Sequence, residues 1–244
     1  MYINNIHILY YFFIGLLGLG IGVLLDWITK RLSNHKPIFS KEFFTSYIKG
    51  FKANYKLMYI NAIIYVILLY MCGWNLELIK YLIISPLLLS AFVIDYKEQI
   101  IPNRLTLTLF EVGLFFAFIE GTVNLSFLID KLLGLAIGGG IFLIITLIGG
   151  LIAGKEAMGF GDVKLMGALG IIFGAYNIVI ISILSFLLAA IISIILIVSK
   201  RKKANEYIPF GPFIVIATFL VMLVPEHLML LILLKIFTLG MFKA

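Results

Sequence analysis

Two uninterrupted apolar runs limit the folds open to this chain more than any other feature. They cover residues 132–153 (LLGLAIGGGIFLIITLIGGLIA) and 176–199 (YNIVIISILSFLLAAIISIILIVS). Each run exceeds the roughly 18 apolar residues that indicate a helix crossing a bilayer. Within lipid a helix satisfies its own backbone hydrogen bonds, whereas loops and open sheet edges leave theirs unpaired. The runs therefore predict an integral membrane protein built from helices.

The composition extends this prediction to the whole chain. Of its 244 residues, 63% are hydrophobic and 13% are charged, and the mean hydropathy is +1.15. Soluble domains have roughly 45–50% apolar and about 25% charged residues. We therefore expect an all-α, polytopic bundle of about eight transmembrane helices. The apolar windows are 8–25, 58–73, 79–94, 104–120, 127–153, 163–175, 177–198 and 209–224.

The two terminal apolar segments each allow a second interpretation. Segment 8–25 resembles the apolar part of a signal peptide, but no Lys or Arg precedes Lys30 and no small-residue cleavage site is obvious, so we interpret it as the first span. Segment 228–242 contains Lys235. It fits either a short ninth span or a helix lying at the membrane interface.

The distribution of basic residues predicts the orientation of the spans. The long polar segment after the first span is rich in them: Lys30, Arg31, Lys36, Lys41, Lys49, Lys52 and Lys56. The positive-inside rule places this segment in the cytoplasm, together with the loops near residues 95–104, 154–162 and 200–203. The opposite loops, MCGWNLE, EGTVN and VPEH, contain no Lys or Arg. Lys80 and Lys131 lie just inside adjacent spans, from which we expect them to snorkel outward.

The same asymmetry explains the net charge of +7. The KRKK run at 200–203 is interpreted as an orienting cluster that also contacts anionic lipid head groups. Membrane lipid is therefore an expected partner. A nucleic-acid partner is not expected, because no soluble domain is present to carry such a site.

Most of the twelve acidic residues fall in loops, where solvation or local salt bridges account for them. The outer group is Glu77, Glu120, Asp130 and Glu226, and the cytoplasmic group is Glu42, Glu98, Glu156 and Glu206. Four others lie in or beside apolar segments: Asp26, Asp95, Glu111 and Asp162. Acids within spans are costly and mark functional sites by default. A structural alternative is that Asp95 and Asp162 lie hydrated at the interface, with Asp162 as a helix N-cap.

Several details favour a functional pair made of Asp95 and Asp162. Gly159 and Gly161 flank the second aspartate, and glycine lets another backbone or a substrate approach closely. Both aspartates have the same predicted depth and side, beside loops that water can reach. Two carboxylates that meet cannot both ionise cheaply, so one keeps a proton while the other acts as a base. Such a pair can activate water against an amide carbonyl.

Three motifs, in this order and on one predicted side, resemble those of the type IV prepilin peptidases, which are GxGD-type membrane aspartyl proteases. DYKEQIIPNRLT (95–106) is similar to the segment with the family's first catalytic aspartate, followed by Pro-Asn or Pro-Asp. GFGDVKL (159–165) resembles the Gly-x-Gly-Asp motif, and YIPFGPFI (207–214) resembles the Pro-Phe-Gly-Pro segment that opens the last span. Together with the span pattern, the resemblance covers roughly residues 80–224.

The resemblance implies a peptidase of the bacterial cytoplasmic membrane with its active site facing the cytoplasm. Such enzymes remove the basic leader from prepilins and pseudopilins of pili, secretion systems or competence systems, just before the substrate's hydrophobic helix. Asp95 and Asp162 would be the catalytic pair, acting without a metal or cofactor. The implied site-shaping residues are Pro102, Asn103, Gly159, Gly161, Lys164, Pro209, Phe210, Gly211 and Pro212.

The N-terminal third departs from the family pattern. Many members carry two Cys-x-x-Cys pairs in the first cytoplasmic loop, where four thiolates can bind zinc. This chain has one cysteine, Cys72, so that site cannot form here. We divide the chain into an N-terminal part (1–80, with the basic loop 30–57) and a peptidase core (81–244). S-adenosylmethionine is expected as a cofactor only if the family's N-methyltransferase activity is retained.

Two alternatives to a simple peptidase remain open at this point. The first is an ion- or proton-coupled transporter that uses Asp95, Glu111 and Asp162 as a relay. The second is a bifunctional enzyme that also methylates the new N-terminus of its product.

Overall fold

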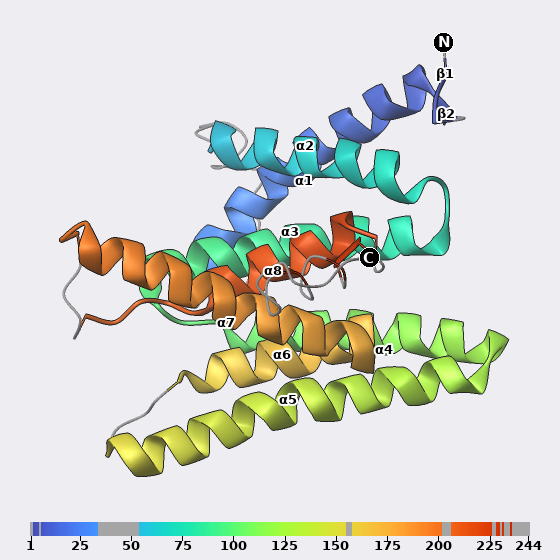
Figure 1. Cartoon of the computed structure of the whole chain (residues 1–244). Helices are drawn as coiled ribbons and strands as arrows, with labels where there is room; N and C mark the ends of the chain where they lie inside the picture. The colour runs from blue at the N-terminus through green and yellow to red at the C-terminus, as the bar shows by residue number, and fades with distance from the viewer. Residues whose placement is uncertain are drawn as a thin grey trace.

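The computed structural model is a bundle of helices (Figure 1). It describes residues 2–4, 6–33, 54–154, 158–201, 206–225, 228–229, 231 and 235. The described helices are α1 (Ile8–Ser33), α2 (Tyr55–Cys72), α3 (Leu76–Glu98), α4 (Asn103–Val123), α5 (Leu125–Ala153), α6 (Phe160–Phe173), α7 (Ala175–Val198) and α8 (Gly211–Leu223). Two short antiparallel strands, β1 (Tyr2–Ile3) and β2 (Ile6–His7), precede α1. The predicted helical membrane bundle is confirmed, and the small hairpin is an addition to it.

Each of the eight predicted spans coincides with one of these helices. Six of them, α1 to α5 and α7, are long and apolar enough to cross a membrane, and α8 is a shorter apolar helix. The chain is therefore a multi-pass membrane protein. The proposed ninth segment, 228–242, and most of the basic loop, 34–53, lie outside the described residues.

Asparagine and glycine set several of the helix ends. Asn54, Asn75 and Asn124 are N-caps whose side chains accept hydrogen bonds from backbone N–H groups two or three residues further on, which satisfies donors that the helix leaves free. At the other ends, Gly73 and Gly174 have positive φ values of 70° and 87°, a conformation that glycine adopts without strain. These turns reverse the chain between neighbouring spans.

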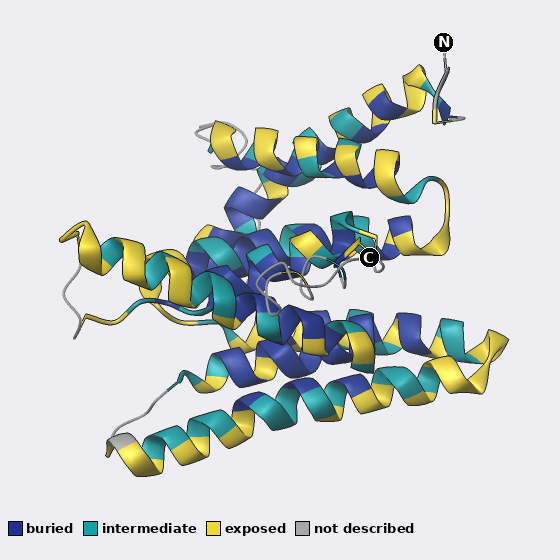
Figure 2. Cartoon of the chain, viewed as in Figure 1, coloured by how far each residue is buried: buried dark blue, intermediate teal, exposed yellow. Residues whose placement is uncertain are grey.

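The centre of the bundle is formed by α3, α6 and α8, where most residues are buried (Figure 2). Helix α6 has only 14 residues, and it packs against α4, α5 and α7. The contact with α5 is close because glycines face each other: a Cβ atom at Gly170 would overlap the backbone of Gly134. Helix α6 is too short to cross the membrane in contact with lipid, and the neighbouring helices enclose it.

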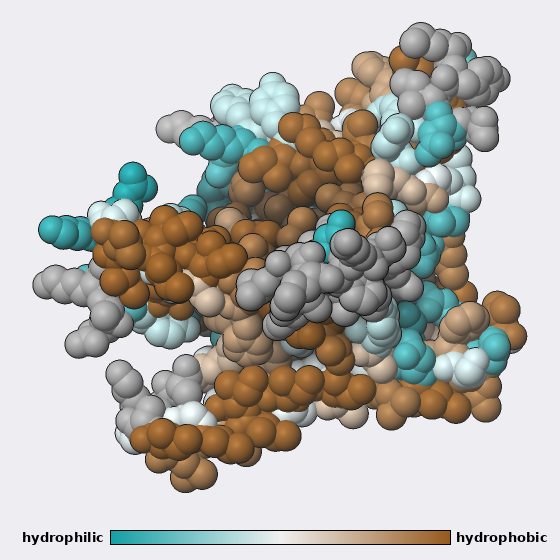
Figure 3. Space-filling model, viewed as in Figure 1, coloured by the Kyte–Doolittle hydropathy of each residue, from teal (hydrophilic) through white to brown (hydrophobic). Residues whose placement is uncertain are grey.

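The outer surface is apolar where the helices face outward. Exposed large hydrophobic side chains are frequent on α1, α2, α5 and α7, and hydrophobic residues cover most of the face seen in Figure 3, with hydrophilic residues at its two ends. Such a belt is the surface that lipid covers. The helix axes run between the two polar ends.

Successive helices run in opposite directions. Helices α1, α3, α5 and α7 have their C-terminal ends at one end of the bundle, and α2, α4 and α6 have theirs at the other (Figure 1). The last turn of α3 and the first turn of α6 therefore share an end. These turns carry Asp95 and Asp162.

Candidate active site

Asp95 is fixed by a hydrogen bond from a distant part of the chain. It is 3% exposed and lies in the last turn of α3. The backbone N–H of Gly211, the first residue of α8, donates to Asp95 Oδ2 at 2.9 Å. Because this N–H belongs to the first turn of a helix, it has no partner within α8 and is free to bind a carboxylate.

Asp162 is buried to the same degree, at 3% exposed, but it is held differently. It is the third residue of α6, whose N-cap is Gly159 and has no side-chain capping bond. The interpretation of Asp162 as an N-cap is therefore wrong. Asp162 Oδ1 is a buried atom with no hydrogen-bond partner among the described residues. A buried polar atom without a partner is rare and costly, and it indicates a functional role.

The two aspartates line one pocket of about 520 Å³ at this end of the bundle. Asp95 reaches it from the last turn of α3 and Asp162 from the first turn of α6. Backbone and side chains from all three motifs complete the lining, among them Asn103, Gly159, Gly161, Lys164 and Tyr207. Both aspartates are enclosed by protein, so the alternative of two carboxylates that are simply hydrated at the interface does not hold.

Two motif glycines make room for a residue that sequence reasoning missed, Ile101. A Cβ atom at Gly161 would lie 3.1 Å from Ile101 Cβ, and one at Gly211 would lie 3.2 Å from Ile101 Cδ1 and 2.6 Å from Asp95 Oδ2. The side chain of Ile101 thus lies between the start of α6 and the start of α8. No signal in the sequence separates Ile101 from its neighbour Ile100.

Lys164 and Asn103 join two of the motifs directly. Lys164 Nζ donates a hydrogen bond of 2.8 Å to Asn103 Oδ1, which connects the first turn of α4 to α6. The ammonium group also lies 5.3 Å from the ring centroid of Phe160. Lys164 is exposed, whereas most residues of α6 are buried. The sequence placed both residues near the site but did not predict that they bind each other.

The remaining predicted residues shape the backbone around the pocket. Pro102 is the N-cap residue of α4, and its carbonyl accepts the backbone N–H of Leu105 at 3.0 Å. The carbonyl of Gly159 accepts the backbone N–H of Asp162, also at 3.0 Å. Pro209 is buried in the segment that leads into α8. These residues lie in the segments that carry the aspartates or their partner Gly211.

Tyr207 is a second residue that sequence reasoning did not single out. It lines the pocket, and burial together with the nearby charges of Asp162 and Asp95 raises the pKa of its phenol. Tyr207 therefore stays protonated and can donate a hydrogen bond into the pocket. Its position two residues before Pro209 was the only available signal.

The other two acids singled out in the sequence, Asp26 and Glu111, do not belong to this pocket. Asp26 is paired with Lys30 at 2.7 Å, and Glu111 is exposed on α4. Neither lines the pocket that holds Asp95 and Asp162. Within the described ranges, no cluster of three or more His, Cys, Asp or Glu side chains is placed to hold a metal ion.

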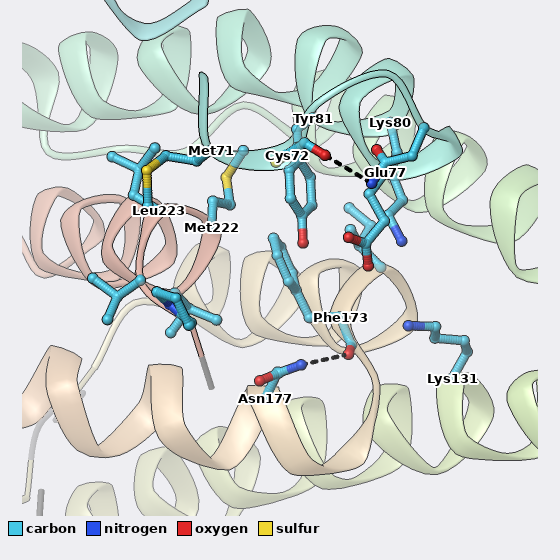
Figure 4. Close-up of a pocket in the computed structure, with 15 residues that line it drawn as sticks. Met71, Cys72, Glu77, Lys80, Tyr81, Lys131, Phe173, Asn177, Met222 and Leu223 are labelled. Carbon is cyan, nitrogen blue, oxygen red and sulfur yellow. Dashed lines mark hydrogen bonds between the residues drawn. The ribbon is translucent and has the colours of Figure 1, made fainter. Parts of the chain in front are cut away.

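A second pocket, of about 450 Å³, lies at the opposite end of the bundle (Figure 4). Lys80 and Lys131 line it, and both bind Glu120, at 2.7 and 3.5 Å. The expectation that Lys80 snorkels outward is wrong, since its side chain is only 4% exposed. Its partner Glu120 lies at the far end of α4 and pairs with it there.

Comparison with known proteins identifies the central part of the chain. Residues 82–194 match the type IV leader peptidase family. The chain is 33% identical over 151 residues to a prepilin leader peptidase/N-methyltransferase of Aeromonas hydrophila, covering 62% of this chain and 50% of that protein. It is 26% identical over 162 residues to the protein of the same name from Neisseria gonorrhoeae, covering 66% and 54%.

These matches define how far the relationship extends. The chain spans about half the length of the curated relatives that it matches, and no solved structure matches it significantly. The matched segment runs from α3 to α7 and includes Asp95 and Asp162. Residues 82–194 of this chain are thus similar to the type IV leader peptidase family.

Proposed function

We propose that this chain is a membrane aspartyl endopeptidase that uses Asp95 and Asp162 to cleave the leader from prepilin-like precursors. The observation that carries this proposal is the pocket itself. Two buried carboxylates from different helices line it, and one of their oxygens, Asp162 Oδ1, has no partner among the described residues. A buried carboxylate with a free oxygen is suited to bind water or a carbonyl group.

The reaction needs only these two carboxylates and one water molecule. One carboxylate removes a proton from the water, whose oxygen attacks the carbonyl carbon of the scissile amide, while the other carboxyl group protonates the carbonyl oxygen. The tetrahedral intermediate then collapses, the C–N bond breaks, and the leaving nitrogen takes up a proton. The pair titrates as one unit.

The residues around the pair position it. The N–H of Gly211 orients Asp95, and the hydrogen bond between Lys164 and Asn103 fixes the start of α6 against α4. Ile101 packs between Gly161 and Gly211. Its side chain thereby holds the start of α6, which carries Asp162, in place relative to the start of α8, which binds Asp95. Correct placement of reacting groups is a large part of enzymatic rate acceleration.

The proposed substrate is a single-span helical precursor whose basic leader lies at the cytoplasmic membrane face. The relatives are named prepilin leader peptidases, and the basic residues beside the pocket end of the bundle orient that end toward the cytoplasm. The enzyme would then lie in the bacterial cytoplasmic membrane and meet both lipid and precursor there. Leader cleavage at this face fits a pocket located at the end of the helices.

Methylation of the new N-terminus is a second candidate activity, because the relatives are also named N-methyltransferases. Residues 82–194, which match the peptidase family, do not include α1 and α2. S-adenosylmethionine would be the methyl donor of this second reaction. A radiolabelled methyl group on the cleaved product would show that activity, and its absence would restrict the chain to proteolysis.

The transporter alternative is less consistent with the structure. A relay needs Glu111 near the two aspartates, and Glu111 is exposed on α4 and does not line their pocket. Both aspartates also lie at one end of the bundle (Figure 1), away from the midplane where coupling sites of transporters lie. Proteolysis is therefore the better explanation of the pair.

The test combines a cleavage assay with a flux assay on the same reconstituted protein. In liposomes, the wild-type chain should shorten a prepilin-like precursor by its leader, as measured by mass spectrometry, and should carry no proton or sodium flux. Asp162→Asn should abolish cleavage, while Glu98→Gln, an exposed carboxylate on α3, should retain it. Flux without cleavage would refute the peptidase and support a transporter.

A further inference from the structure

An apolar groove begins directly beside the candidate active site. It has a volume of about 460 Å³ and lies between α4, α5 and α6. Helix α4 contributes Leu107 and Phe110, among others. The complete lining is Asn103, Thr106, Leu107, Phe110, Leu135, Gly139, Val163, Lys164, Gly167 and Ala168. Leu107 is 56% exposed, so the groove opens toward the lipid side of the bundle.

The groove and the pocket of the aspartates share two residues, Asn103 and Lys164. These are the residues joined by the 2.8 Å hydrogen bond, and this bond therefore marks the boundary between the polar pocket and the apolar groove. A polypeptide bound across the boundary would have an extended segment near Asp95 and Asp162 and an apolar segment along α4 and α6.

We propose that the groove binds the hydrophobic helix of the precursor, on the C-terminal side of the bond that is cleaved. This inference rests on the proposed function. The lining supports it in two ways: it is mostly apolar, as the interior of a membrane requires, and it includes the small residues Gly139, Gly167 and Ala168. Small residues are enriched where transmembrane helices pack together, because they let the helix axes approach closely.

Gly139 can carry a side chain without disturbing the packing of α5 against α6. A Cβ atom at Gly139 would have its nearest neighbour, Gly167 Cα, at 3.7 Å, which is an ordinary contact. At Gly134 and Gly170 a Cβ atom would instead overlap backbone atoms of the facing helix. Gly139 lines the groove and is not closed off by the facing helix, whereas the space at the other two glycines is filled by the fold.

The decisive variant is Gly139→Leu, which fills the groove, with Gly140→Leu as its control. Gly140 is the next residue of the same helix, and a Cβ atom there meets nothing within 4 Å. Two substrates are compared: a full precursor with its hydrophobic helix, and a short peptide that ends a few residues beyond the scissile bond. Only the full precursor can occupy the groove.

We expect Gly139→Leu to raise the KM for the full precursor by about tenfold, as overpacking of a binding surface does. Cleavage of the short peptide should stay within about twofold of wild type, and Gly140→Leu should change neither. An unchanged KM of Gly139→Leu for the full precursor would overturn the proposal. Failure of the wild type to cleave either substrate would instead refute the proposed function.

Disulfide trapping tests the position of the precursor helix without relying on kinetics. It decides whether the groove binds that helix if Gly139→Leu cleaves neither substrate. Cys72 is the sole cysteine of the chain, so Leu107→Cys is introduced together with Cys72→Ser. A precursor with one cysteine in the second turn of its hydrophobic helix should cross-link to this variant. Ile148→Cys, at an exposed position on α5 outside the groove, should not cross-link. Equal trapping at both positions, or labelling of the groove by an acyl-chain probe alone, would refute a helix site.

Discussion

At the scale of single residues, the two buried carboxylates are stabilised to different extents. Asp95 accepts the N–H of Gly211, while Asp162 Oδ1 has no partner in the described part of the chain. A carboxylate within a membrane costs about 2.5–3.5 kcal/mol at the bilayer centre and less toward the interface. The position of both groups at one end of the bundle reduces that cost. The remaining cost at Asp162 is consistent with a group kept for its chemistry.

The contact between Gly211 and Asp95 leads to a first prediction. In Gly211→Ala the backbone N–H remains, but the new Cβ atom would lie 2.6 Å from Asp95 Oδ2, so the carboxylate must move. A displacement of about 1 Å in a catalytic group costs on the order of 100-fold in rate. Cleavage by the purified variant should fall by about that factor. Gly20→Ala, where a Cβ atom meets nothing within 4 Å, should cleave as wild type, and full activity of Gly211→Ala would contradict the assigned contact.

The sequence was sufficient to single out some residues of the site but not others. Asp95 and Asp162 were recognisable because a carboxylate stands out in an apolar segment and because both adjoin loops of the same side. Ile101 and the bond between Asn103 and Lys164 were not recognisable. They depend on how α4 and α6 are rotated about their axes, and hydropathy does not report that rotation. Tyr207 resembles any interfacial tyrosine until its neighbours are known.

At the scale of elements, the short helix α6 depends on its neighbours. Its 14 residues are buried on nearly all sides, since α4, α5 and α7 pack around it. Non-spanning segments are tolerated inside membrane proteins when protein, and not lipid, surrounds them. The enclosure fixes the first turn of α6, and with it Asp162.

The close approach of α5 and α6 gives a second prediction, on stability. In Gly170→Ala the added methyl group would overlap the backbone of Gly134, and neither helix can yield without losing other contacts. We expect a loss of about 1–3 kcal/mol, seen as a lower Tm in detergent. Gly140→Ala on α5 meets open space and serves as the control. A Tm of Gly170→Ala equal to that of the control would show that the helices do not pack as described.

Element positions were predictable from the sequence, whereas element ends were less so. Hydropathy located all eight described helices because each coincides with an apolar window, although only six of them are long enough to span a membrane. It placed the start of the sixth at residue 163, while α6 begins at Phe160, and it ended the first at residue 25, while α1 continues to Ser33. Ends depend on caps and packing: the N-cap of α6 is Gly159, which makes no side-chain bond that a sequence pattern could reveal.

At the scale of the whole molecule, the proposed orientation rests on the distribution of charge. In the sequence, basic residues lie in or directly beside the loops that follow α1, α3, α5 and α7, whose last turns are at the end that holds the aspartates (Figure 1). The loops that follow α2, α4 and α6, at the other end, contain no Lys or Arg. The lysines Lys80 and Lys131 near that other end are bound to Glu120. Paired in this way, they do not oppose the orientation set by the loops.

Cysteine labelling provides a third prediction, on this orientation. In a Cys72→Ser background, Val123→Cys at the end of α4 and Ser199→Cys at the end of α7 place one thiol at each end, at positions that are exposed. A membrane-impermeant maleimide added to intact spheroplasts should label Val123→Cys, and it should label Ser199→Cys only after permeabilisation. The reverse pattern would place the aspartates on the outer face and exclude cleavage of a cytoplasmic leader.

The central claim is that Asp95 and Asp162 act together on one water molecule, and a double-mutant comparison of cleavage rates tests it most directly. Groups that act as a unit are not additive: each single removal costs about as much as removal of both. We therefore predict that Asp95→Asn, Asp162→Asn and the double variant, all inserted normally, each lose at least about 1,000-fold in kcat/KM for a prepilin-like precursor. Substantial cleavage by either single variant, or losses that simply multiply in the double variant, would contradict a shared catalytic pair.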